Sequence, residues 1–263
     1  MKRIFLFAAA LLLAIAAYSQ TQSRQEPFEV RQNVLFADGS LDEYTTTEWN
    51  SSYTRIELQE RYSASGALLE QVEFSYNDDR GVLGAKITRD VELRIRSRVV
   101  YQYNTQNRVH RENLVDNRGR VVSTYDFTYD SRGNTIKRVI KNRAGETLAE
   151  TTYNYDNQNR ITSSQTRNPG GGVISSTTYI YDGNQVRQNV TDGNGNPTSV
   201  VTATMRDGLE VENVMTSATT NTMQMRIRNE YGQNRELLVK NIENFQGNSR
   251  QVIRFEYVFR PRR

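Results

Sequence analysis

Apolar and aromatic residues alternate with polar residues along most of this chain. Tyr125, Phe127 and Tyr129, for example, are separated from one another by the polar residues Asp126 and Thr128. A period of two is typical of a β-strand with one aromatic face and one polar face. The same alternation recurs at 74–76 and 153–155. We therefore expect β-strands throughout the chain and little helix beyond its first residues.

Short polar stretches rich in Asn, Asp and Gly follow the aromatic strands, as at 130–134 (DSRGN). These residue types tolerate the left-handed backbone that tight hairpin turns require. A second, more polar strand comes next, as at 135–140, and then a second turn that carries Gly119, Gly145 or Gly171. Each unit of the pattern is thus predicted to be a β-hairpin.

The hairpin pattern repeats at an interval of 26 residues. This interval separates Tyr103, Tyr129, Tyr155 and Tyr181 from one another, and also Tyr231 from Tyr257. Met205 stands 24 residues after Tyr181 and 26 before Tyr231, and steps of 27 lead from Trp49 to Tyr76 and from Tyr76 to Tyr103. Chained hairpins predict an all-β fold, an antiparallel β-meander of about 14–16 strands that forms a curled single sheet or a partly closed barrel.

The first residues have the features of a secretory signal peptide. Lys2 and Arg3 precede an apolar run that ends in small residues, which predicts a signal peptide at 1–19 and cleavage between Ser19 and Gln20. Residues 20–40 form a predicted N-terminal segment or cap, although the stretch 34–39 (VLFADG) could be an eroded first strand and turn; residues 41–263 form the hairpin repeat domain. We expect an exported protein, periplasmic or extracellular, with no transmembrane helix, because no later stretch reaches the roughly 20 apolar residues of a spanning helix.

Composition excludes several classes of protein. The 263 residues include no Cys, a single His, 4 Pro and 16 Gly, so a disulfide scaffold, a thiolate metal site and collagen are excluded. Removal of Lys2 and Arg3 with the signal lowers the formal charge of +4 by two. A nucleic-acid partner is therefore not expected.

The recurring Tyr-Asp followed by a Gly or Asn turn, at 129–134 (YDSRGN), 155–160 (YDNQNR) and 181–184 (YDGN), resembles the tyrosine-aspartate repeats of Rhs-type proteins. The resemblance covers roughly residues 70 to 190, and the 26-residue unit is longer than is usual in that family. It implies a β-sheet architecture and a cell-envelope or surface setting. We expect no toxin domain after Arg263. More loosely, the chain resembles short Tyr- and Gly-rich hairpin repeats of exported bacterial proteins.

The aromatic face supplies the candidate binding residues. One interpretation is that this ladder packs inward and holds the repeats together, since an aromatic stripe is usually core. The other is that part of it stays accessible and binds a glycan or an acyl chain. The ladder comprises Tyr76, Tyr101, Tyr103, Tyr125, Phe127, Tyr129, Tyr153, Tyr155, Tyr179, Tyr181, Tyr231 and Tyr257.

Catalytic and metal sites are not expected. His110 has no companion His or Cys, and it is interpreted as an outward position on a polar strand. The stretch 192–196 (DGNGN) resembles the opening of a calcium loop, but Ala203 stands where the bidentate Glu is needed, so a hairpin turn is predicted. Asp78 and Asp79 fall in a predicted turn and make a poor acid/base pair. We expect no enzyme, no cofactor and no metal.

Two functions of different kinds are compatible with these patterns. The first is a non-catalytic binding or scaffold protein of the bacterial cell envelope, with an envelope polymer, a glycan or a protein as partner. The alternative is a periplasmic carrier that holds a lipid or another apolar ligand against the aromatic ladder. The three Arg within 260–263 (RPRR) are interpreted as a solvated tail, or else as a group attracted to anionic polymers. An outer-membrane barrel is disfavoured, because strands such as 161–166 (ITSSQT) present little apolar surface to lipid and the mean hydropathy is −0.73.

Overall fold

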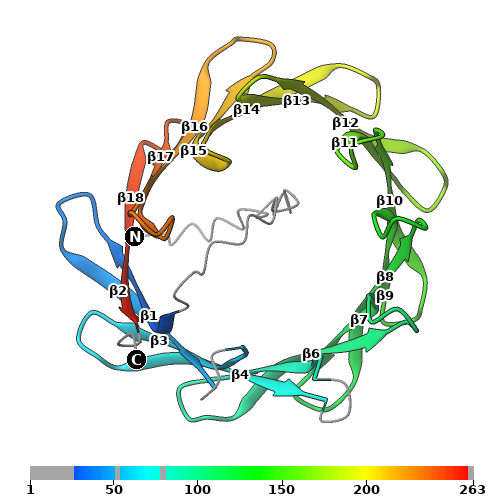
Figure 1. Cartoon of the computed structure of the whole chain (residues 1–263). Coiled ribbons are helices and arrows are strands. Elements are labelled where there is room, and N and C mark those ends of the chain that lie inside the picture. The colour runs from blue at the N-terminus through cyan, green and yellow to red at the C-terminus, as the bar shows by residue number, and fades with distance from the viewer. Residues whose placement is uncertain (1–26, 51–53, 78–80, 260–263) are drawn as a thin grey trace.

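The computed structural model describes residues 27–50, 54–77 and 81–259, which form one antiparallel sheet of 18 strands. Each strand pairs with the next along the chain, and β1 pairs with both β2 and β18, so the sheet closes into a barrel (Figure 1). The predicted all-β meander is confirmed, with a closed barrel and a larger number of strands than the expected 14–16. The signal peptide, the cleavage site at Ser19–Gln20, Asp78 and Asp79, and the tail 260–263 lie outside the described residues.

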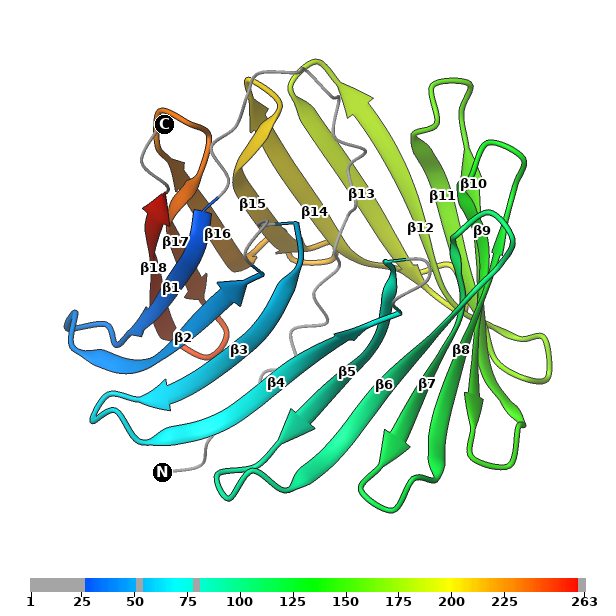
Figure 2. The ribbon, with the colours of Figure 1, turned by 60° about the horizontal axis from the view of Figure 1, so that its bottom comes forward.

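The strands run alternately up and down the wall of the barrel (Figure 2). Their bounds are β1 (Pro27–Leu35), β2 (Leu41–Trp49), β3 (Ile56–Ser63), β4 (Leu68–Tyr76), β5 (Leu83–Arg89), β6 (Ile95–Tyr103), β7 (Val109–Asp116), β8 (Val121–Tyr129) and β9 (Thr135–Asn142). The second half of the wall consists of β10 (Thr147–Tyr155), β11 (Ile161–Arg167), β12 (Val173–Asp182), β13 (Gln185–Asp192), β14 (Pro197–Arg206), β15 (Leu209–Ser217), β16 (Met223–Tyr231), β17 (Leu237–Asn244) and β18 (Ser249–Phe259).

Strand β1 closes the barrel. It lies in the segment for which we expected a cap, and its Val34 is paired with Ile253 of β18 on one side and with Glu43 of β2 on the other. An open sheet would leave two rows of unpaired backbone N–H and C=O groups at its edges. Closure by β1 pairs both rows, so this segment is a full strand of the wall.

Most hairpin turns share one hydrogen-bonding pattern, which explains the polar pentapeptides of the sequence. In the turn after β8, the backbone N–H of Asp130 donates to the carbonyl of Asn134 (3.0 Å), and that of Gly133 donates to the carbonyl of Asp130 (3.1 Å). The Asp130 carboxylate also accepts from the backbone N–H of Asn134 (2.8 Å). Gly133 has φ +97°, a left-handed conformation that glycine adopts without steric cost. Asn, another residue that tolerates this conformation, occupies the equivalent position at Asn107 and Asn159.

A shorter turn explains the interval of 24 residues in the repeat. Between β12 and β13 the loop contains only Gly183 and Asn184, with Tyr181 opposite Val186. In the turn after β8, which is longer, Tyr129 lies opposite Thr135, and a bulge separates this pair from the regular register of β8 and β9. The hairpin without the bulge takes two residues fewer, and Met205 accordingly follows Tyr181 by 24 residues instead of 26.

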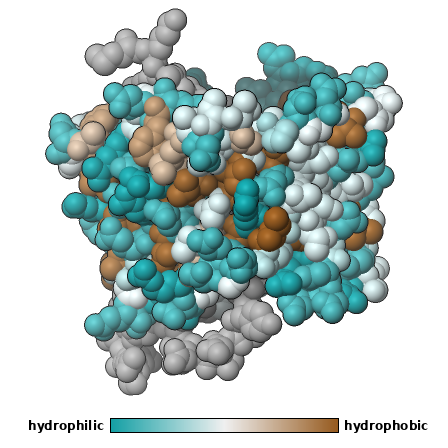
Figure 3. All heavy atoms as spheres, turned by 90° about the horizontal axis from the view of Figure 1, so that it is seen from above, coloured by the Kyte–Doolittle hydropathy of each residue, from teal (hydrophilic) through white to brown (hydrophobic). Residues whose placement is uncertain are grey.

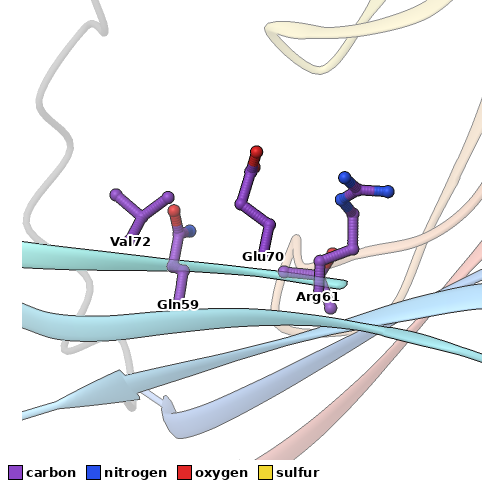
Figure 4. A pocket seen from close by; sticks show the side chains of 5 residues that line it. Gln59, Arg61, Glu70 and Val72 are labelled. Atoms are coloured by element: carbon purple, nitrogen blue, oxygen red, sulfur yellow. The ribbon is translucent and has the colours of Figure 1, made fainter. Parts of the chain in front are cut away.

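The two faces of the wall differ in chemistry. Figure 4 shows Gln59, Arg61, Glu70 and Val72 rising from β3 and β4 into the lumen. Residues directly opposite one another in a sheet share a face, so the register carries this assignment around the barrel and places the whole aromatic face on the lumen side. Side chains crowd on a concave surface, and four of the most buried residues lie on this face: Thr47, Thr151, Gln188 and Ala203.

Charged residues occupy the outer face. Near the middle of β8, the Asp126 carboxylate binds Arg111 Nε (2.5 Å) and Lys141 Nζ (2.8 Å), and both partners come from adjacent strands. Arg111 is the largest cause that lowers the Asp126 pKa, through its hydrogen bond, and Lys141 adds to it. A similar cluster on β16 and β17 joins Glu243 to Arg226 (2.6 Å). Hydrophilic side chains cover much of one side of the outer wall, with hydrophobic ones scattered between them (Figure 3).

Candidate ligand-binding lumen

The aromatic ladder consists of two rows with different surroundings. The first row, which we term the rim tyrosines, lies at the end of the even-numbered strands. Each rim tyrosine donates its hydroxyl hydrogen to a backbone carbonyl at the start of the preceding strand. The pairs are Tyr76 with Ile56 (2.9 Å), Tyr103 with Leu83 (2.8 Å), Tyr129 with Val109 (2.6 Å), Tyr155 with Thr135 (2.8 Å), Tyr181 with Ile161 (3.0 Å), Tyr231 with Glu210 (2.8 Å) and Tyr257 with Leu237 (2.7 Å).

Arginine side chains from the turns cover several rim tyrosines. The Arg108 guanidinium lies 5.8 Å from the ring centroid of Tyr129 and also lies against Gly133, where a Cβ atom would come within 2.4 Å of its Nη2. Arg160 lies 4.5 Å from the ring centroid of Tyr181 in the same way. A guanidinium over an aromatic ring is an attractive arrangement. The rim tyrosines therefore join successive hairpins, which is the structural role that the first interpretation of the ladder predicts.

The second row, which we term the inner aromatic row, lies two residues deeper in the same strands. It consists of Phe74, Tyr101, Phe127, Tyr153, Tyr179 and Phe255, with Tyr125 a further two residues along β8. On β14 and β16 the equivalent positions hold Ala203 and Asn229, so the row is interrupted there. Burial is the main cause that raises the pKa of Tyr101 to about 12, and it also raises the pKa of Tyr179. These rings face the lumen without the backbone contacts of the rim row.

Polar uncharged side chains surround the inner row on β10 to β13. They include Thr151, whose hydroxyl lies 3.0 Å from that of Thr166, and Ser164, which is opposite Tyr153. Gln188 is opposite Tyr179 and is only 1% exposed; its Nε2 has no hydrogen-bond partner among the described residues. This part of the lumen wall thus combines aromatic rings with hydroxyl and amide groups.

Charged side chains enter the lumen on β2 to β9. Arg61 Nη1 forms an ion pair with Glu43 (2.8 Å), beside a shallow pocket of about 100 Å³ that Thr45, Gln59 and Val72 also line (Figure 4). On β7, Glu112 is directly opposite Tyr101 on one side and Tyr125 on the other. Burial raises the Glu112 pKa, and the positive charges of Lys86 and Arg138 partly offset the effect.

His110 lies on the lumen face, so the predicted outward position is wrong. Its neighbour Arg111 faces outward and binds Asp126, and alternation therefore turns His110 inward with Glu112. Its Nδ1 is buried and has no hydrogen-bond partner within the described part of the chain. The misassignment arose because β7 is polar on both faces. Asp192, in contrast, lies in the expected turn, where its carboxylate accepts from the backbone N–H groups of Asn194 and Asn196 (2.9 Å each).

The described residues contain no group of three or more His, Cys, Asp or Glu side chains that could hold a metal ion. Nor does this part of the chain contain a helix long and apolar enough to cross a membrane.

Comparison with known proteins shows structural similarity alone. No protein-family model and no curated protein matches the sequence. The structure is similar to a porin-like protein from Bacteroides uniformis ATCC 8492, with 11% identity over 89% of this chain and 98% of that chain and a TM-score of 0.47. It is also similar to parts of two Tc toxin structures. These are the TcdB2-TccC3-Cdc42 complex (13% identity, 81% of this chain, 16% of that chain, TM-score 0.24) and the Photorhabdus luminescens Tc holotoxin pore (10%, 82%, 18% and 0.24). The chain spans less than a fifth of the toxin chains, and membership of the tyrosine-aspartate repeat family stays a prediction.

Sequence reasoning identified the aromatic ladder but missed the charged lumen residues Lys86, Glu112 and Arg138. No local signal marked them, because β5, β7 and β9 contain no Phe, Tyr or Trp, and only the register with neighbouring strands places these side chains on the lumen face. These residues come from β5, β7 and β9, so only the pairing of three hairpins places them on one wall of the lumen.

Proposed function

We propose that this protein is an exported, non-catalytic binding protein of the bacterial cell envelope that holds a glycan in the lumen of its barrel. The observation that carries the proposal is the position of the inner aromatic row, which faces the lumen. Barrels of 16–18 strands are too wide for wall side chains to fill, so the lumen has space for a ligand.

The chemistry of the lumen wall supports a sugar ligand. The faces of tyrosine rings suit the apolar faces of sugar rings, and hydroxyl groups such as that of Ser164, which is partly exposed, can exchange hydrogen bonds with sugar hydroxyls. An acyl chain offers no partner for these polar groups, whose burial without hydrogen bonds costs free energy. The wall therefore favours a polar ligand over the lipid of the carrier alternative.

The outer face supports a barrel surrounded by water, in the periplasm or outside the cell. Asp126 lies near the middle of the wall and binds Arg111 and Lys141, and a second cluster joins Arg226 to Glu243, the last but one residue of β17. A cationic side chain on the lipid face of a membrane barrel costs roughly 2–4 kcal/mol at the bilayer midplane. Several such clusters would make insertion into a bilayer unfavourable.

The proposal is tested on the mature chain that begins at Gln20, purified without detergent. Calorimetric titration with neutral and acidic oligosaccharides is expected to show binding, and replacing Tyr101 and Tyr153 of the inner row together with Ser is expected to abolish it. The matched control replaces Tyr44 and Tyr62, which stack on the outer face with ring centroids 5.0 Å apart, and should leave binding intact.

Two results would contradict the proposed function. One is purification only with detergent, since the outer wall would then be a lipid-facing surface. The other is mass spectrometry of the extracted protein that finds a stoichiometric lipid which the inner-row variant no longer retains. That result would establish the carrier alternative.

A further inference from the structure

The positive charges of the lumen wall between β5 and β9 are accompanied by a dense group of aromatic rings. Lys86 is on β5, with its Nζ 5.3 Å from the ring centroid of Phe74, and Arg138 is on β9, directly opposite Phe127. Within the described part of the chain, neither cation forms a salt bridge within 4.0 Å. The lumen cation Arg61, in contrast, is paired with Glu43 at 2.8 Å.

Glu112 lies between these two cations on a diagonal across the sheet. The row that contains Glu112 also contains Tyr101 and Tyr125, its direct neighbours on β6 and β8. Relative to this row, Lys86 lies two residues nearer one rim, opposite Val99, and Arg138 lies two residues nearer the other rim, opposite Phe127. Neighbouring strands among these five are about 4.8 Å apart. Both cations act electrostatically on the Glu112 carboxylate. A carboxylate acceptor, two cationic donors and two tyrosine rings thus share one patch of wall.

From this arrangement we infer that the patch is a subsite for a sugar that carries a carboxylate, such as a hexuronic acid unit within a glycan. The inference rests on the proposed function and specifies the chemical class of its ligand. Arg138 binds the sugar carboxylate, Glu112 accepts hydrogen bonds from ring hydroxyls, and the tyrosines pack against the sugar ring. Lys86, on the other side of Glu112, adds a positive charge that attracts the acidic sugar. One positive charge remains after Glu112 is counted, which matches the single negative charge of one uronic acid.

The Arg138 side chain supplies a second reason for an anionic ligand. Its Nε is buried and has no hydrogen-bond partner among the described residues. A guanidinium presents donors in a planar fork that matches a carboxylate, so an incoming carboxylate can pair with the terminal donors of Arg138, which is directly opposite Phe127 on one side and Thr151 on the other.

The test compares trigalacturonate with galactotriose, two trisaccharides that differ at the C6 carboxylate, by calorimetry on the mature chain. Trigalacturonate is expected to bind at least tenfold more tightly, with an affinity that falls as salt rises. In the variants Arg138→Gln and Lys86→Gln the preference is expected to shrink at least fivefold, while galactotriose binding stays within twofold. Glu112→Ala should weaken galactotriose binding more than trigalacturonate binding, because it removes an acceptor of hydroxyl hydrogen bonds from both sugars and a negative charge that repels only the acidic one.

Arg111→Gln is the matched control, because it removes a cation from β7 on the outer face and should leave the preference unchanged. Equal affinity for both trisaccharides, or a preference that survives in Arg138→Gln and Lys86→Gln, would overturn the inference and leave glycan binding itself intact. Absence of binding by either trisaccharide and by the other oligosaccharides would instead contradict the proposed function. Circular dichroism of each variant verifies that the barrel is folded.

Discussion

The rim tyrosines allow a direct measurement of what one repeated hydrogen bond contributes to the barrel. In Tyr129→Phe the ring remains, and only the hydroxyl that donates to the Val109 carbonyl at 2.6 Å is removed. A neutral hydrogen bond contributes a net of about 0.5–1.5 kcal/mol. We therefore expect the free energy of unfolding to fall by about 1 kcal/mol, which lowers the melting temperature by about 2 to 4 °C for a domain of this size.

The assay is urea unfolding followed by circular dichroism, with Tyr153→Phe as the matched control. Tyr153 also faces the lumen, but no hydrogen bond joins its hydroxyl to another described residue. Its replacement should change the free energy of unfolding by less than about 0.5 kcal/mol, as for other substitutions that remove no partnered group.

The triple variant at Tyr103, Tyr129 and Tyr155 extends the measurement. These hydrogen bonds are in separate hairpins, and the effects of distant sites usually add. The expected loss is about 3 kcal/mol in total. Equal losses in Tyr129→Phe and Tyr153→Phe, or no loss in the triple variant, would refute the idea that the hydroxyl groups join the hairpins.

Three further predictions concern the turns and the pH dependence of stability. Gly133→Ala should destabilise more than Gly119→Ala in thermal unfolding, because both glycines have positive φ but only a Cβ at Gly133 would meet another group, Arg108, at 2.4 Å; equal losses would exclude that contact. The Asp116 pKa is lowered to about 2, first by its side-chain hydrogen bond from Arg120. The ionised carboxylate therefore stabilises the folded state above about pH 4, the unfolded pKa, and this stabilisation is lost as pH falls toward about 2. In Asp116→Asn, the free energy of unfolding should vary less steeply with pH between about 4 and 2. Burial raises the Tyr101 pKa to about 12. The stability that the neutral phenol contributes is therefore present below pH 10 and is lost between pH 10 and 12. Absorbance at 295 nm should show tyrosines that ionise only in this range, and full ionisation of all tyrosines by about pH 10.5 would contradict the prediction.

The sequence predicted the local structure well because the signals are local. Alternation along 125–129 identified a strand, and the pentapeptide at 130–134 identified a turn; both depend on residues within a few positions of one another. One of the strands missing from the expected number is the stretch 27–35, which lacks the aromatic ladder. Its identity as a strand comes from pairing with β18, more than two hundred residues away, and no local pattern records that contact.

The candidate site was predicted only in part. The residues of the ladder were found by their spacing, but a spacing of 26 gives the same signal for Tyr129, which binds a backbone carbonyl, and for a residue that faces the lumen freely. Substitution of Tyr129 and Tyr155 with Ser would therefore perturb stability as well as any ligand, whereas the inner row, with Tyr101 and Tyr153, can report on binding by itself. The two rows differ only in depth, and depth is a property of the assembled wall.

The sequence by itself determined the hairpin unit, its turns and the division of each aromatic strand into an aromatic face and a polar face, because a strand of period two sorts its side chains without reference to the rest of the chain. Only the tertiary structure decided that the aromatic face is the inner one and that Lys86, Glu112 and Arg138 share a patch of the lumen. The direction in which a sheet curls and the strands that become neighbours depend on the twist and closure of all 18 strands together. Closure thus turned a repetitive pattern into a lumen with a chemistry of its own.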